Sequence, residues 1–258
     1  MVKSGGSSIK DKLKHAALVD SIPDAATCIN RPGREDICVD AMKNAEVITG
    51  YVEMLRHPLQ RMGRPCQYFT VMRDPIDRLI SAFFYCPTDH DVQRDRPDKW
   101  CGDRYDPAPL PERLVEYAQF KWGNKAYRQM GYAIYCPKGA FCEQSRPGAP
   151  PSLDHTGGWE LFGNITAILG TYTAVGILEH WDLSMQLFDA KVKSPVRDWQ
   201  AMTMSNAGIT SGTRDELGKW ARRSPEIHKI LAPDMLIYQF SVSVFKMQTM
   251  QTLGTIWD

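Results

Sequence analysis

The segment 66–84 constrains the fold most, because its pattern predicts a buried strand that runs directly into an amphipathic helix. Residues 66–72 are rich in the aromatic and β-branched side chains that favour strands. They stop at Arg73-Asp74-Pro75, and proline is well tolerated at the start of a helix. The next apolar residues recur at helical spacing: Ile76, Leu79, Ile80, Phe83 and Phe84. A strand that feeds a helix in this way is the repeating unit of a parallel sheet covered by helices.

Other segments repeat this order. Residues 173–178 predict a strand that is followed by a helix over 179–190, and residues 46–49 predict a short strand closed by Gly50 and Tyr51. Further helices are predicted over 7–19, 110–119, 213–223, 225–231 and 233–247, where Pro233 separates the last two. Most of residues 20–45 fit no element clearly. The sequence therefore predicts an α/β fold, with a parallel β-sheet flanked by helices and right-handed connections.

Length and charge limit the classes of protein that fit. The 258 residues, 43% of them hydrophobic, suffice for one core, so we expect 1–258 to form a single domain with irregular loops at about 86–111 and 136–158. A net charge of +1 gives no reason to expect a nucleic-acid partner. No apolar run approaches the roughly 18 residues needed to span a membrane, so we expect the chain as written to be soluble, without membrane contact.

The seven cysteines do not predict a metal site. None of them forms a CxxC pair or has a histidine at the spacing of a zinc site. Cys86, Cys101, Cys136 and Cys142 lie in loops rich in Pro, Gly and Asp, where disulfides would be useful. The placement of these cysteines is therefore compatible with an oxidising compartment. At least one thiol would be free, because the number of cysteines is odd.

The N-terminal loop Lys3-Ser4-Gly5-Gly6-Ser7-Ser8 has the composition of an anion cradle. Glycines let backbone N–H groups approach a phosphate, and the predicted helix that follows offers further N–H groups and a positive dipole end. In a Walker loop the lysine follows the last glycine, whereas Lys3 precedes both, which argues against a nucleotide phosphotransferase. A flexible tail is the alternative reading. Only two residues precede Lys3, so the strand expected before such a loop is missing and we expect an N-terminal truncation.

A second anion motif follows the strand predicted at 66–72. Arg73 stands at the strand end, and Ser81 lies two turns into the helix. An arginine offers two parallel hydrogen bonds to a phosphate, and the serine hydroxyl can donate from the same side. The alternative is an ion-paired turn that only caps an ordinary helix.

Together the two motifs resemble those of the sulfotransferases that use 3′-phosphoadenosine 5′-phosphosulfate (PAPS), in particular the Golgi carbohydrate O-sulfotransferases of the heparan, dermatan and galactose type. Residues 3–8 are similar to the 5′-phosphosulfate loop of that family. Arg73-Asp74-Pro75, followed by Arg78, Ser81 and Phe83, is similar to its 3′-phosphate motif. Weaker similarity covers 175–180 and 234–240.

The resemblance implies a P-loop-like nucleotide-binding fold and transfer of a sulfuryl group from PAPS to an acceptor hydroxyl, that of a carbohydrate. Lys3 would stabilise the departing negative charge, the loop from Ser4 through Gly5, Gly6, Ser7 and Ser8 would bind the 5′-phosphate, and Arg73 with Ser81 would bind the 3′-phosphate. The scheme requires no metal. The family also implies a location in the Golgi lumen, for a full-length form with an upstream membrane anchor.

The catalytic base is less clearly indicated. Related carbohydrate sulfotransferases often carry a Gly-His pair after the strand between the two motifs, and this chain has Gly50-Tyr51 there. Tyr51 is a poor base unless its pKa of about 10 is lowered. His57 is the nearest imidazole, although a surface histidine is the alternative interpretation. A non-catalytic or weakly active relative that binds PAPS or its product, adenosine 3′,5′-bisphosphate, is therefore a second hypothesis.

Overall fold

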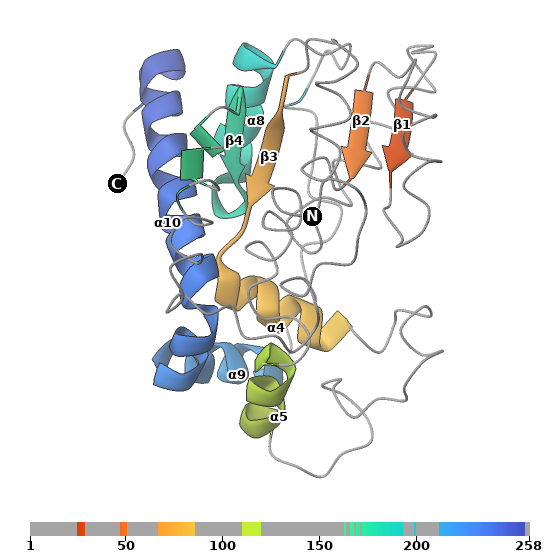
Figure 1. The fold of residues 1–258 in the computed structure, drawn as a ribbon, viewed down its shortest axis with the longest axis vertical. Coiled ribbons are helices and arrows are strands. Elements are labelled where there is room, and N and C mark those ends of the chain that lie inside the picture. Colours follow the sequence, from red (N-terminus) through yellow and green to blue (C-terminus); the bar gives the residue numbers. More distant parts are fainter. Residues whose placement is uncertain are drawn as a thin grey trace.

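Two pairs of parallel strands characterise the part of the chain that the structure describes, and in one pair each strand is followed by a helix (Figure 1). The structure is a computed structural model, and it describes residues 25–28, 47–50, 67–85, 110–119, 163, 166–167, 169–170, 172–192, 199 and 212–255. Most of these residues are helical. The predicted α/β class is thus met in its coarse features, which are parallel strands and strand-to-helix units.

Strands β3 (Phe69–Met72) and β4 (Ala174–Ile177) pair in parallel, with Phe69 opposite Ala174 and Met72 opposite Ile177. Helix α4 (Pro75–Tyr85) follows β3 after a turn of two residues. The 3-10 turn η5 (Leu178–His180) and helix α8 (Trp181–Lys191) follow β4. Both strand-to-helix units predicted from the sequence are confirmed.

The outer edge of β4 is closed by side chains. The Val175 amide donates to Gln248 Oε1 at 2.9 Å, and the Ile177 amide donates to Ser184 Oγ at 2.8 Å. Gln248 Nε2 also donates to the carbonyl of Tyr172 at 3.1 Å. These amides are therefore satisfied without a further strand beside β4.

A second parallel pair joins β1 (Ala25–Cys28) to β2 (Val47–Gly50). Strand β2 confirms the strand predicted at 46–49, displaced by one residue, whereas β1 lies in the segment that fitted no element clearly. In the view of Figure 1 the arrows of β1, β2 and β3 point in the same direction.

The remaining helices are α5 (Leu110–Tyr117), α9 (Gly212–Arg223) and α10 (Pro225–Leu253). The first two confirm the predicted helices. The predicted break at Pro233 is wrong, because α10 continues through it as a single helix of 29 residues. Pro233 is buried and the helix packs into the core on both sides of it, so tertiary contacts outweigh the lost backbone hydrogen bond.

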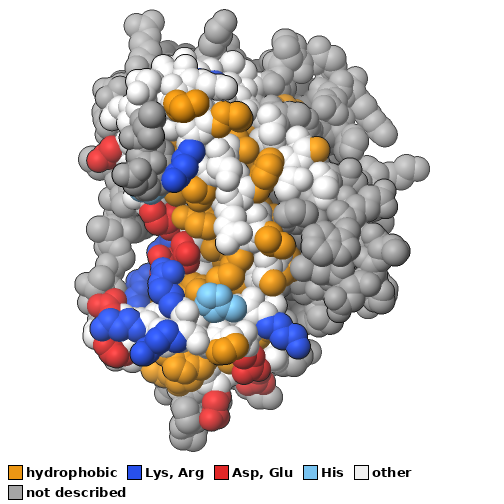
Figure 2. All heavy atoms as spheres, turned by 90° about the vertical axis from the view of Figure 1, so that its left-hand side faces the viewer, with side chains coloured by type: hydrophobic (Ala, Val, Ile, Leu, Met, Phe, Trp, Pro, Cys, Tyr) orange, Lys and Arg blue, Asp and Glu red, His pale blue; other side chains and the backbone are white. Residues whose placement is uncertain are grey.

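Helix α10 contributes to both hydrophobic clusters. Its first turns contribute Ile227 and Leu231 to a cluster formed with α4, α5 and α9. Its later turns contribute Ile237, Val244 and Phe245 to a cluster formed with β3, β4 and α8. Figure 2 views the face along α10, where hydrophobic and uncharged side chains cover much of the described surface and charged groups gather toward one end. None of the described helices is long and apolar enough to cross a membrane.

Candidate functional site at the end of β3

The turn between β3 and α4 is built around Asp74. Its Oδ1 accepts hydrogen bonds from the amides of Ile76 and Asp77, both at 2.9 Å, and its carbonyl accepts from the amide of Arg78 at 2.9 Å. Asp74 is therefore the N-cap of α4, and Pro75 needs no partner because it has no N–H group. This local chemistry explains why the helix begins directly after Arg73-Asp74.

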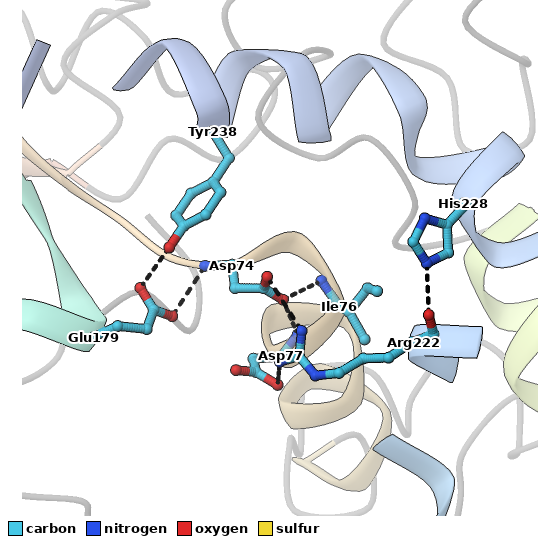
Figure 3. A network of polar contacts seen from close by, with 7 residues as sticks. All are labelled: Asp74, Ile76, Asp77, Glu179, Arg222, His228 and Tyr238. Atoms are coloured by element: carbon cyan, nitrogen blue, oxygen red, sulfur yellow. Dashed lines mark hydrogen bonds and ion pairs between the residues drawn. The ribbon is translucent and has the colours of Figure 1, made fainter. Parts of the chain in front are cut away.

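A carboxylate from the neighbouring strand-to-helix unit holds the same turn. Glu179, in η5 after β4, accepts from the Asp74 amide through Oε1 at 3.0 Å and from the Tyr238 hydroxyl through Oε2 at 3.1 Å (Figure 3). Burial, and then the negative charge of Glu179, raise the pKa of Tyr238 well above its ordinary value. Tyr238 therefore remains a hydrogen-bond donor at physiological pH.

Helix α9 supplies Arg222 to the start of α4 (Figure 3). Its Nη2 lies 2.6 Å from Asp77 Oδ1 and its Nη1 lies 3.4 Å from Asp74 Oδ2. Burial acts to lower the pKa of Arg222, but the two carboxylates more than offset this and leave it above its ordinary value. The negative charges of Asp74 and Asp77 are thus partly compensated by Arg222 of α9.

Arg78 and Asp234 form an ion pair between α4 and α10 in which both side chains are buried. Arg78 belongs to the sequence motif, yet in the structure it contacts a carboxylate inside the protein. A role in joining helices therefore fits Arg78 better than binding a ligand.

Arg73 occupies the carboxyl end of β3 and is half-buried. Burial lowers its pKa, while the charges of Asp77 and Glu179 act in the opposite direction and that of Arg214 lowers it further. The guanidinium stays protonated at physiological pH, because an arginine pKa lies far above 7. It is a partly desolvated cation that interacts electrostatically with these neighbouring charges.

Ser81 is half-buried on α4, four residues after Asp77 and therefore on the same helix face. The structure thus places Arg73 and Ser81, two of the predicted binding residues, on one strand-to-helix unit. The other predicted site residues lie outside the described residues: Lys3, Ser4, Gly5, Gly6, Ser7, Ser8, Tyr51 and His57. Strand β2 ends at Gly50, the residue before Tyr51.

Sequence reasoning did not predict the contacts of Glu179, Asp234 and Tyr238. Both Asp234 and Tyr238 lie on α10. Asp234 lies 156 positions after its partner Arg78, and Tyr238 lies 59 positions after its partner Glu179. One signal was present for Glu179, since it follows a predicted strand directly. The carboxyl ends of neighbouring parallel strands meet at one edge of a sheet.

Within the described part of the chain, the side chains include no group of three or more His, Cys, Asp or Glu residues placed to hold a metal ion. Comparison of the chain with protein-family models, with curated proteins and with solved structures finds no match.

Proposed function

We propose that the protein is a PAPS-dependent O-sulfotransferase that transfers a sulfuryl group to a hydroxyl of a carbohydrate. The observation that carries this proposal is the place of Arg73, at the carboxyl end of a parallel strand and at the start of the helix that bears Ser81. Ligands of α/β proteins bind at this end of the strands.

The chemistry around Arg73 suits a phosphate. A planar guanidinium can donate two parallel hydrogen bonds to phosphate oxygens, and partial burial strengthens such a contact. Arg222 partly compensates the negative charges of the nearby Asp74 and Asp77, so these carboxylates oppose an incoming anion less. In the proposal Arg73 and Ser81 bind the 3′-phosphate of PAPS.

The rest of the proposal comes from the sequence resemblance. Residues 4–8 would bind the 5′-phosphate, Lys3 would stabilise the departing negative charge, and Tyr51 or His57 would act as base. The fold would be that of a P-loop-like sulfotransferase domain, and the location of a full-length form would be the Golgi lumen. No metal takes part in this scheme.

A second candidate function is binding without transfer, which Gly50-Tyr51 favours because related enzymes often have a histidine after this glycine. A transfer assay separates the two candidates. Labelled sulfate moving from PAPS to one of a panel of glycans supports the enzyme, and binding without any transfer supports the binding protein. Phosphate transfer from ATP with magnesium, in the absence of sulfate transfer, would contradict both.

The first test is thermal unfolding with adenosine 3′,5′-bisphosphate. At about 100 times Kd the ligand should raise the Tm by roughly 5–10 °C. Arg73→Ala should abolish the shift. Arg223→Ala is the matched control, because Arg223 is an exposed arginine of α9 whose Nε donates to the carbonyl of Lys219 in its own helix. The absence of a shift in the unmutated protein would contradict the proposed function.

A further inference from the structure

The start of α4 offers no backbone N–H group to a ligand. The amides of Ile76 and Asp77 donate to Asp74 Oδ1, that of Arg78 to the Asp74 carbonyl, and that of Asp74 to Glu179. Pro75 has none. An anion at the start of α4 must therefore be bound by side chains, and its binding depends on where the Arg73 side chain points.

One of these hydrogen bonds reaches another strand-to-helix unit. The Asp74 amide belongs to the planar peptide that joins Arg73 to Asp74, so its direction is tied to the backbone conformation of Arg73. Glu179 Oε1 fixes that direction from the end of β4. The hydrogen bond thus acts on the residue that carries the guanidinium.

Glu179 is itself held in place. The Tyr238 hydroxyl donates to its second oxygen from α10, so both oxygens of the carboxylate have protein donors. Figure 3 shows Glu179 between Tyr238 and the Asp74 amide. Three segments that are far apart in the sequence therefore determine the geometry of this one peptide.

We propose that Glu179 is a positioning residue that orients the Arg73–Asp74 peptide and so directs the Arg73 guanidinium toward the ligand's 3′-phosphate, an inference that rests on the proposed function. Loss of the negative charge of Glu179 and loss of its positioning role would change ligand affinity in opposite directions. A carboxylate close to Arg73 repels an anion, so loss of its charge alone would tighten binding. Loss of its positioning weakens binding.

The test compares two nucleotides by titration calorimetry. Adenosine 3′,5′-bisphosphate carries the 3′-phosphate, whereas adenosine 5′-phosphate lacks it. Glu179→Ala should weaken binding of the bisphosphate by about five- to tenfold and leave that of the monophosphate unchanged, because Arg73 contacts only the 3′-phosphate. Glu179→Gln keeps an oxygen that can accept from the Asp74 amide and should restore binding. Glu216→Ala, which removes an exposed carboxylate of α9, should change neither constant.

Each outcome has a distinct meaning. If Glu179→Ala binds the bisphosphate as tightly as the unmutated protein or more tightly, while Arg73→Ala loses it, the positioning role is overturned and the proposed function stands. Equal weakening for the two nucleotides also overturns positioning, since it indicates a general loss of structure. If the unmutated protein binds neither nucleotide, the proposed function fails and the inference fails with it.

Discussion

At the scale of single residues, Asp74 combines roles that usually fall to several side chains. Its amide donates to Glu179, one carboxylate oxygen caps α4, and the other lies 3.4 Å from Arg222. A carboxylate next to the first turn of a helix also interacts favourably with the helix dipole. Arg73 is therefore followed by a residue whose backbone and side chain are both fixed.

Tyr238 should give the turn a measurable pH dependence. Its pKa is raised in the folded protein, so the stability it contributes is fully present below the ordinary tyrosine pKa of about 10 and is lost as the pH rises beyond it. Tyr238→Phe should cost about 1 kcal/mol at pH 8. Urea unfolding at pH 8, 9, 10 and 10.5 should show this difference shrinking above about pH 10.

The comparison with Tyr238→Phe cancels the titration of all other groups, since they occur in both proteins. A difference in free energy of unfolding that stays constant up to pH 10.5 would contradict the raised pKa of Tyr238.

At the scale of elements, the β4 unit depends on close contact between strand and helix. A Cβ atom at Gly176 would stand 3.0 Å from Phe188 Cζ and 3.0 Å from Ser184 Cβ, both on α8. Only a residue without a side chain allows this approach without displacing α8. Ser184 also binds the Ile177 amide at the end of the strand, so the packing of α8 and the edge of β4 are coupled.

Gly176→Ala should therefore destabilise the protein by about 1–3 kcal/mol, because the added methyl group forces α8 away from β4. Gly218→Ala is the matched control. Gly218 lies inside α9 with nothing within 4 Å of its added Cβ, so alanine should stabilise that helix by about 0.5–1 kcal/mol. Chemical denaturation measures both changes, and a neutral Gly176→Ala would contradict the tight packing.

The elements predicted correctly are those that residues close together in the sequence specify. The β3 and β4 units were predictable because apolar strands end at polar turns that cap helices. The strand Ala25–Cys28 was missed because its sequence, Ala-Ala-Thr-Cys, has few β-branched or aromatic side chains. The continuity of α10 was missed because Pro233 is a local breaking signal, while the packing that overrides it comes from distant residues.

At the scale of the whole molecule, α10 connects the two hydrophobic clusters. Ile227 and Leu231 belong to one cluster and Ile237, Val244 and Phe245 to the other. Asp234, between these two sets on α10, pairs with Arg78 of α4. The ion pair therefore ties α4 to α10 at the junction of the two cores.

Asp234→Ala should cost about 3–5 kcal/mol, since it leaves the buried Arg78 guanidinium without this carboxylate. Replacing both partners, as in Arg78→Met with Asp234→Leu, should recover much of that loss because no unpaired charge stays buried. Urea denaturation checks both variants. A single variant no less stable than the double one would contradict the ion pair.

The candidate site was predictable only in its local part. The places of Arg73 after β3 and of Ser81 on α4 could be predicted from the strand-to-helix motif that contains them. Glu179 lies 105 positions from Asp74, and Asp234 lies 156 positions from Arg78. Sequence pattern alone does not specify which distant side chains meet, because that depends on how the elements pack.

Gln248 and Ser184, which close the outer edge of β4, also determine at which edge a further strand can join the sheet. A strand approaching that edge would have to displace Gln248 from the Val175 amide and Ser184 from the Ile177 amide. Open edges attract foreign strands, and this one is shielded without a charge or a bulge. Any strand that extends the sheet, from this chain or from an extended peptide, must therefore join it beside β3.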